Sequence, residues 1–256
     1  MRSSFATPLR RVMNSVYPSG SKIFPLAAPL EGYKMRLEWR SSKAFVFGTY
    51  ELEVTRALQQ IVQTDWVVFD IGAHIGYFAL LLARLVGPNG RVFAFEPFPD
   101  NFRALEENVR MNGCLNVIME NRAVAAVSGL ANLKSNDTDD LTYTSSLVDG
   151  RPMLEVEVVS LDDYTAGLQA RVQFVMMDVE GAEADVLKGM RSTLQRDFPT
   201  LLIELHGFDQ WGESHPALQE LHSMGYSFRY LDGPGAQVHV LVERRITKTD
   251  DGRPIC

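Results

Sequence analysis

The chain has 256 residues, of which 46% are hydrophobic and 22% charged, and these values are those of a globular protein with one large domain or two small ones. Its formal net charge of −7 argues against a nucleic-acid partner, because proteins that bind phosphates usually carry a basic stripe. Two cysteines without CxxC spacing indicate neither a structural zinc site nor a disulfide framework, and they favour a cytoplasmic location.

Residues 1–50 are expected to form an N-terminal arm or lid. The first 30 residues carry four basic side chains and no acidic one, and they lack the apolar core of a secretory signal. A flexible basic arm or a small helical lid is therefore favoured over a targeting segment. The longest apolar run, Phe78 to Val86, is too short to span a membrane, so no membrane span is expected.

Residues 51–245 are predicted to form one domain, and 246–256 a tail. Helical periodicity or helix signals mark four segments: 51–63, 76–86, 99–111 and 182–194. Short apolar runs predict five strands: 66–71, 91–96, 116–120, 172–178 and 201–206. This alternation predicts a doubly wound α/β fold with a mostly parallel sheet. Residues 122–160 predict a hairpin or excursion, and 226–243 an antiparallel C-terminal edge.

A glycine loop follows the first buried strand. The strand ends in Asp70, and the loop continues through Gly72, Ala73 and His74 to Gly76. In open α/β sheets, ligands bind beyond the carboxyl ends of the strands. We expect Gly72 to allow close approach of the backbone to a ligand, and Gly76 to allow tight packing of the next helix.

The second strand ends in Glu96, 20 residues after Gly76, where a carboxylate can accept two hydrogen bonds from a ribose diol. Nucleotide-type cofactors with pyrophosphate use GxGxxG, whereas this loop reads GxxxG and is preceded by an acid. The pattern favours S-adenosylmethionine, whose amino and sulfonium groups are cationic. A nicotinamide-dependent oxidoreductase and a tight turn without a ligand remain alternatives.

Acidic residues also end the later strands. Asp178, Glu180 and Glu183 follow one strand, and Glu204 and His206 close the next, facing the same side by strand alternation. Because hard cations prefer clustered oxygens, a divalent metal held by Asp178, Glu204 and Glu180 is one hypothesis. Helix capping by the same acids is the alternative.

The chain resembles the FkbM-type S-adenosylmethionine-dependent methyltransferases over roughly residues 45–210. The resemblance is carried by VFGTYE, FDIGAHIGYFAL, AFEPFPDNFRALEENVRMN, SLDDY, DVEGAEADVLKGM and PTLLIELHG. It implies a class I, Rossmann-like methyltransferase fold. It also implies methylation of a hydroxyl on a sugar, polyketide, glycan or other small natural product.

The resemblance assigns roles to particular residues. The cofactor would lie against the following positions: Tyr50, Glu51, Asp70, Gly72, Ala73, His74, Glu96, Pro97, Asn121, Ala123 and Asp178. Asn121 and Ala123 would be beside the adenine, and Glu180, Glu183 and Glu204 on the acceptor side. His206 and Asp178 are the candidate bases for removing the hydroxyl proton.

The sequence departs from the family pattern at Met176, where the family usually has lysine. The absence of this lysine would leave neighbouring carboxylates less neutralised and raise their pKa values. It also keeps open a non-catalytic relative that retained the fold. The acceptor pocket is expected to come from the N-terminal arm and from residues 134–150 and 207–216.

Overall fold

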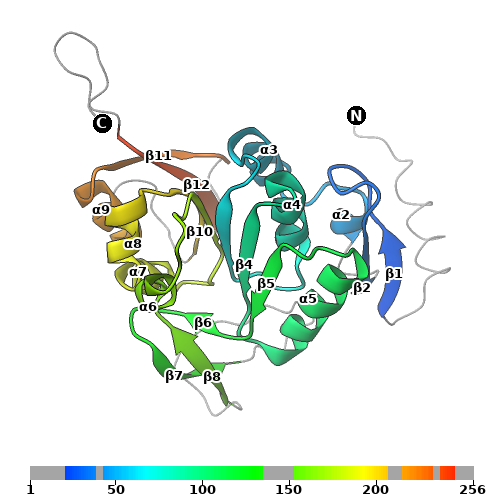
Figure 1. Ribbon diagram of the computed structural model, residues 1–256, viewed down its shortest axis with the longest axis horizontal. Coiled ribbons are helices and arrows are strands. Elements are labelled where there is room, and N and C mark those ends of the chain that lie inside the picture. Colours follow the sequence, from blue (N-terminus) through cyan, green and yellow to red (C-terminus); the bar gives the residue numbers. More distant parts are fainter. Residues whose placement is uncertain (1–20, 39–42, 135–152, 207–214, 233–236, 246–256) are drawn as a thin grey trace, which may run out of the picture.

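The predicted strands form one seven-stranded sheet in the computed structural model of the protein, which describes residues 21–38, 43–134, 153–206, 215–232 and 237–245 (Figure 1). The strands in spatial order are β11 (Tyr226–Tyr230), β12 (Gln237–Arg244), β10 (Thr200–His206), β9 (Phe174–Met177), β3 (Val67–Ile71), β4 (Arg91–Phe95) and β5 (Val117–Glu120). The five strands from β10 to β5 pair in parallel, whereas β12 pairs antiparallel with β10 and β11. The doubly wound fold with an antiparallel C-terminal edge is therefore confirmed.

Helices cover both faces of this sheet (Figure 1). One face packs against α3 (Leu52–Ile61), α4 (Tyr77–Val86) and α5 (Pro99–Met111). The other packs against α6 (Leu161–Ala166), α7 (Glu183–Lys188), α8 (Arg191–Asp197) and α9 (Pro216–Ser223). Neighbouring strand residues face opposite layers: Val68 belongs to the first core and Phe69 to the second. The strands are apolar on both sides because both sides are covered.

The described part of the predicted arm is a strand pair followed by the short helix α2 (Lys43–Val46), while residues 1–20 lie outside the described residues. β1 (Ser21–Pro25) and β2 (Lys34–Glu38) pair antiparallel. The edge of β2 is satisfied by side-chain amides of α5, because the Arg36 N–H donates to Asn108 at 2.7 Å and the Lys34 N–H to Asn112 at 2.9 Å. These bonds fix the strand pair against α5.

The predicted excursion forms a small three-stranded sheet. It consists of β6 (Ala123–Val124), β7 (Gly129–Lys134) and β8 (Met153–Val159). β7 and β8 pair antiparallel, which confirms a hairpin in this region. Residues 135–152 between them, and most of the expected acceptor loop at 207–216, lie outside the described residues.

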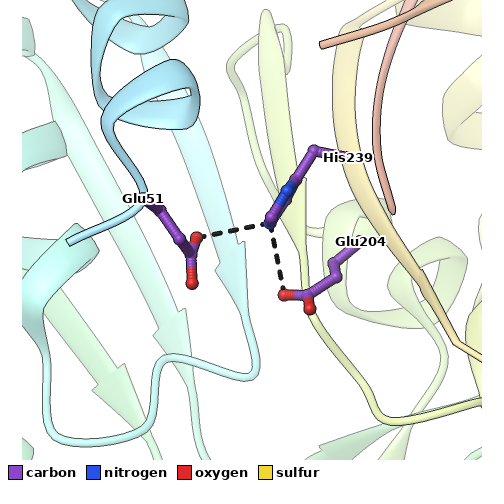
Figure 2. Close-up of side chains that lie close together, drawn as sticks. All are labelled: Glu51, Glu204 and His239. Carbon is purple, nitrogen blue, oxygen red and sulfur yellow. Dashed lines mark ion pairs between the residues drawn. The ribbon is translucent and has the colours of Figure 1, made fainter. Parts of the chain in front are cut away.

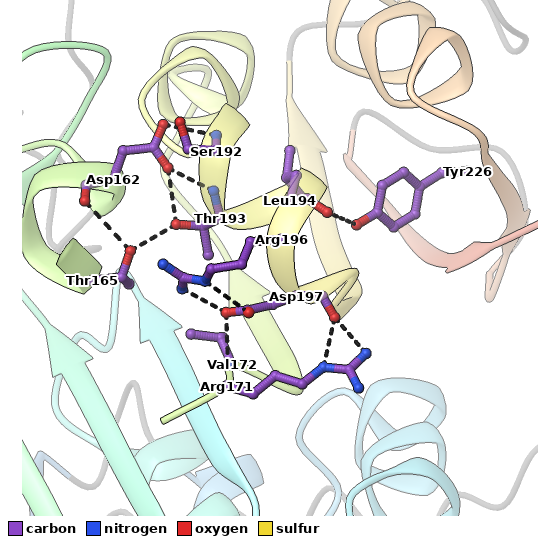
Figure 3. Close-up of polar contacts among 10 residues, drawn as sticks. All are labelled: Asp162, Thr165, Arg171, Val172, Ser192, Thr193, Leu194, Arg196, Asp197 and Tyr226. Atoms are coloured by element: carbon purple, nitrogen blue, oxygen red, sulfur yellow. Dashed lines mark hydrogen bonds and ion pairs between the residues drawn. The ribbon is translucent and has the colours of Figure 1, made fainter. Parts of the chain in front are cut away.

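The single helix predicted for residues 182–194 is wrong, because the chain forms two helices there, α7 and α8, with a break at Gly189. A Cβ on Gly189 would lie 2.0 Å from the carbonyl oxygen of Ala125, and the Gly189 carbonyl accepts from the Asp162 N–H at 2.8 Å. The Asp162 carboxylate then accepts from the N–H groups of Ser192 and Thr193 at the start of α8 (Figure 3). Contacts outside the helix therefore determine where it breaks.

Within the described ranges, none of the helices has the length and apolar character needed to cross a bilayer.

Candidate active site

The polar residues predicted at the strand ends meet at one edge of the sheet. Asp70, Glu96, Asp178 and His206 each lie at or just after the carboxyl end of β3, β4, β9 or β10. Side chains two residues apart on a strand point to the same face of the sheet. All four side chains therefore point to the face that α3, α4 and α5 cover, as Asp70 does two residues after the core residue Val68. The site is therefore an extension of the first hydrophobic core at the point where strand order reverses between β3 and β9.

The glycine loop is shaped mainly by contacts within the chain. A Cβ on Gly72, whose φ is 86°, would lie 1.8 Å from the carbonyl oxygen of Asp178. A Cβ on Gly76, whose φ is 93°, would lie 2.7 Å from Leu105 of α5. Gly76 therefore allows tight helix packing, as expected. The close neighbour of Gly72 is the backbone after β9, so this glycine brings two strand ends together.

Asp70 is a buried carboxylate with an unused acceptor atom. It is 2% exposed, and among the described residues its Oδ2 has no hydrogen-bond partner. Burial and the nearby charge of Glu96 raise its pKa to about 7. Met176 is its register neighbour on β9, so the side chain that replaces the family lysine lies next to this carboxylate. A buried, unpaired carboxylate of this kind suits a cationic ligand.

Glu96 is held in place by the loops on either side. Its Oε2 accepts from the His74 N–H at 2.8 Å, and its Oε1 from the Phe98 N–H at 2.9 Å. Burial raises its pKa to about 7 against these hydrogen bonds, which lower it. Because a carboxylate has about four acceptor positions, the two oxygens retain capacity for a diol.

The remaining predicted cofactor residues surround the same loops. Asn121 donates to the carbonyl oxygens of Glu96 and Pro97 at 2.8 and 3.1 Å, so its amide fixes this turn. Ala123 begins β6 just beyond β5. Burial lowers the pKa of His74 to about 4, which keeps its imidazole neutral near pH 7. The set fits a ligand with cationic and hydroxyl groups.

His206 lies in a cluster of carboxylates. Its Nδ1 is 3.0 Å from Oε1 of Glu183, while its Nε2 lies 3.3 Å from Glu180, 3.5 Å from Glu204 and 3.7 Å from Asp178. Desolvation opposes protonation, but the Glu183 hydrogen bond and the surrounding negative charges raise the pKa of His206 to about 9. Burial and then the charge of Glu204 raise the pKa of Asp178 well above its ordinary value.

Two atoms of this cluster are available to a ligand. Asp178 Oδ1 and His206 Nε2 are buried, and neither has a hydrogen-bond partner in the described part of the chain. They come from adjacent parallel strands, β9 and β10, whose ends converge here. Together they offer a carboxylate oxygen and an imidazole nitrogen to one group placed between them.

Glu183 lies behind His206. The side chain is 1% exposed, and its Oε1 also accepts from the Gly181 N–H at 2.9 Å. The turn before it is tight, with left-handed backbone at Glu180 and Gly181. Glu183 is therefore placed to orient the imidazole rather than to contact an acceptor directly.

Tyr50 and Glu51 reach the cluster from the segment before α3. Tyr50 packs in an aromatic group with Phe45, Tyr77 and Phe78. The Glu51 carboxylate lies 3.3 Å from Nε2 of His239, whose Nε2 is also 3.4 Å from Glu204 (Figure 2). Glu51 thus lies near the end of β10, which carries Glu204. Glu96 follows β4, and β9 and β3 lie between these two strands in the sheet.

His239 is a site residue that the sequence did not reveal. It is the third residue of the antiparallel strand β12 and pairs in register with Glu204. Its Nδ1 lies 2.6 Å from the Asp232 carboxylate, and its backbone N–H donates to the other Asp232 oxygen at 2.9 Å. The only signal was its position near the start of a C-terminal strand, because an antiparallel strand begins where parallel strands end.

Two groups of side chains have the spacing of metal ligands. One contains Asp178, Glu180 and His206, and the other Glu51, Glu204 and His239, with the ligand atoms of each within 4.8 Å of one another. The metal hypothesis from the sequence joined Asp178, Glu180 and Glu204; here Glu204 belongs to a different group from the other two.

Comparisons with known proteins point to one family. Residues 70–228 match the Methyltransferase FkbM domain. The hexuronic acid methyltransferase AglP of Haloferax volcanii is 28% identical over 195 residues, covering 71% of this chain and 74% of that protein. The 31-O-demethyl-FK506 methyltransferase FkbM of Streptomyces tacrolimicus is 28% identical over 215 residues, covering 70% of this chain and 80% of the relative.

The crystal structure of the methyltransferase FkbM from Methylobacillus flagellatus KT matches with a TM-score of 0.50 and 19% identity. The match covers 70% of this chain and 44% of that one, and it supports the fold alone.

Proposed function

We propose, from the premise that this chain belongs to the FkbM family of S-adenosylmethionine-dependent methyltransferases, that it methylates a hydroxyl oxygen on a sugar or polyketide-type acceptor. The observation that carries the proposal is a pair of buried atoms at converging strand ends, Asp178 Oδ1 and His206 Nε2, which accept or donate no hydrogen bond within the described ranges. An alcohol must lose its proton as it is methylated, and both atoms can accept it when unprotonated. Because the pKa of His206 is raised to about 9, we expect a reaction that uses His206 as the base to become faster as the pH rises toward 9.

The donor half of the site would be the loops after β3 and β4. S-adenosylmethionine supplies an activated methyl group when bound. The Asp70 carboxylate, whose Oδ2 has no hydrogen bond from the described residues, would face its cationic part, and Glu96 would accept from its ribose hydroxyls. His74 and Phe98 hold Glu96 through their backbone N–H groups, so this carboxylate is oriented before binding.

The acceptor half would be the cluster around His206. Asp178 and His206 would receive the hydroxyl proton, and Glu183 would orient the imidazole through Nδ1. Glu180 and Glu204 would accept hydrogen bonds from further hydroxyls, which fits a polyhydroxylated acceptor. The names of two relatives, a hexuronic acid methyltransferase and an FK506-type O-methyltransferase, agree with sugar or polyketide acceptors.

The test is methyl transfer from isotopically labelled S-adenosylmethionine to a panel of uronic acid glycosides and polyketide alcohols. NMR of the product distinguishes an O-methyl from an N-methyl or C-methyl group. We expect His206→Gln and Asp178→Asn each to lower kcat by roughly 10²–10⁴-fold, the usual contribution of general base catalysis. We expect Glu183→Gln to lower kcat with little change in KM.

Titration with S-adenosylhomocysteine provides the control, because it reports the donor half alone. His206→Gln should retain this binding, while Glu96→Ala should lose it. Near-normal turnover in both His206→Gln and Asp178→Asn would exclude the proposed bases. Binding of NAD in place of S-adenosylhomocysteine would instead support the oxidoreductase alternative, and donor binding without turnover on the panel would favour a non-catalytic relative.

A further inference from the structure

The side chains around His239 form a second polar centre beside the proposed acceptor site. Six carboxylates form ion pairs with only two imidazoles at this edge of the sheet: Glu51, Asp178, Glu180, Glu183, Glu204 and Asp232. The group nearest β12 consists of Glu51, Glu204 and His239, brought together from the start of α3, from β10 and from β12 (Figure 2). Of this group, the proposed methyl transfer uses only Glu204, which would accept hydrogen bonds from the acceptor; it assigns no role to Glu51 or His239.

The orientation of His239 is the observation that points to a ligand. The residue is 8% exposed, and its Nδ1 is fixed by the Asp232 carboxylate at 2.6 Å. That contact holds the Nδ1 N–H on Asp232, so Nε2 is the ring nitrogen that can carry either a proton or a metal ion. Nε2 is buried without a hydrogen-bond partner among the described residues, and it is directed between two carboxylates.

The distances match those between ligands of one metal ion. Nε2 of His239 lies 3.3 Å from Oε2 of Glu51 and 3.4 Å from Oε2 of Glu204. Ligand atoms about 2.1 Å from a zinc ion lie roughly 3.0–3.5 Å from one another. The two carboxylates need a positive charge beside them, which either a proton on Nε2 or a bound metal ion supplies.

The contact between Asp232 and His239 is the arrangement found behind histidine ligands of metals. A metal-binding histidine usually donates its other ring N–H to a carboxylate, which fixes the ring and raises its basicity. We propose that Glu51, Glu204 and His239 bind a divalent transition-metal ion, with Asp232 orienting the histidine. One nitrogen and two carboxylate oxygens suit Mn²⁺ or Zn²⁺ better than Mg²⁺ or Ca²⁺, which prefer oxygen alone.

The site would also connect parts of the chain that are distant in sequence. Glu51 precedes α3, whereas His239 lies 188 residues later on β12. The ion would tie the segment before α3 to the antiparallel edge of the sheet. It would also hold Glu204, whose other oxygen lies 3.5 Å from the proposed base His206.

The test is calorimetric titration of the full chain, stripped with EDTA, with MnCl₂, together with the Mn²⁺ electron paramagnetic resonance signal. We expect one ion per chain, weaker binding of MgCl₂, and at least tenfold weaker Mn²⁺ binding in both His239→Gln and Glu51→Gln. Glu51→Gln changes one partly exposed side chain, so it keeps the test valid if His239→Gln does not fold.

Two controls locate the ion. Glu180→Gln removes a ligand of the neighbouring group only, and His222→Gln removes a histidine from α9; both should keep Mn²⁺ binding. The proposal is overturned if Mn²⁺ does not bind, if binding persists in both His239→Gln and Glu51→Gln, or if it is lost in Glu180→Gln instead. Titration of the stripped protein with S-adenosylhomocysteine shows independently whether the donor site is intact.

Discussion

At the scale of single residues, the site combines buried carboxylates with very few positive charges. Asp70 and Glu96 are each less than 5% exposed, and burial raises the pKa of both to about 7. A buried carboxylate costs stability when it is ionised and has no partner. Buried carboxylates that destabilise the empty protein are typical of functional sites, where a ligand supplies the missing partner.

Replacement of Asp70 by Asn should therefore have opposite effects on binding and stability. We expect affinity for S-adenosylmethionine to fall by about 10–100-fold, because a charge-assisted contact contributes about 1.5–3 kcal/mol. The empty protein should become more stable at pH 8. The folded-state pKa of Asp70 is raised, so its contribution to stability is present below pH 4 and is lost as the pH rises through 7.

Thermal denaturation at pH 5 and pH 8 measures this effect. The gain in Tm for Asp70→Asn should be larger at pH 8, by about 2–4 °C for each kcal/mol recovered. Asp65→Asn is the control, because Asp65 is an exposed carboxylate in a left-handed turn that asparagine tolerates. A lower Tm for Asp70→Asn than for wild type at pH 8 would assign Asp70 a structural role instead.

At the scale of elements, contacts with neighbouring segments determine where helices end. The sequence predicts one helix over residues 182–194, yet the chain divides there at Gly189 into α7 and α8. The break places Gly189 against Ala125, and the side chain of Asp162 caps the start of α8 (Figure 3). The short α7 that results carries Glu183 at its first position, beside His206.

Gly189→Ala tests this account by the sign of its effect. In an ordinary helix, alanine is favoured over glycine by about 1 kcal/mol. Here a Cβ would lie 2.0 Å from the Ala125 carbonyl oxygen, so we expect a loss of about 2 kcal/mol or more in the free energy of unfolding. Urea denaturation gives this value.

Gly167→Ala is the matched control. Gly167 follows α6 with φ near −92°, and no atom lies within 4 Å of its added Cβ. Its effect should stay within about 0.5 kcal/mol, the usual range for a surface substitution. A stabilised Gly189→Ala would indicate that α7 and α8 can join into one helix.

At the scale of the whole molecule, the glycine loop is supported from the N-terminal strand pair through α5. Asn108 of α5 is fully buried; its Oδ1 accepts from the Arg36 N–H of β2, and its Nδ2 donates to the Ile75 carbonyl oxygen at 2.9 Å. One amide thus joins β2, α5 and the loop after β3. Figure 1 shows β2 lying beside α5. The described part of the N-terminal segment therefore supports the proposed donor site from behind.

Asn108→Ala should lower the free energy of unfolding by about 1–3 kcal/mol, because it leaves two half-buried backbone groups without their side-chain partner. It should also weaken binding of S-adenosylhomocysteine, because Ile75 loses its anchor. Asn116→Ala is the control, since Asn116 donates to Ala83 and Gly87 at the far end of α4. Asn116→Ala should lose stability while keeping its affinity for S-adenosylhomocysteine. Equal affinity in both variants would show that the strand pair does not support the donor site.

The sequence by itself determined the order of the elements and which acidic residues follow the buried strands. Buried parallel strands are continuous apolar runs, so β3, β4, β9 and β10 could be recognised locally, together with the acids that follow them. The helix of α5 was predicted at the observed residues, Pro99–Met111. These features depend on neighbours a few residues apart, which a sequence displays directly.

Only the tertiary structure decided how the acceptor side is arranged. The pairing of His239 with Glu204 depends on the register of β12 against β10, and the approach of Glu51 depends on where α3 packs. The position of Glu183 behind His206 depends on the helix break at Gly189 and on the tight turn at Glu180. Each of these is a contact between residues distant in sequence, and no local pattern of residues encodes such a contact.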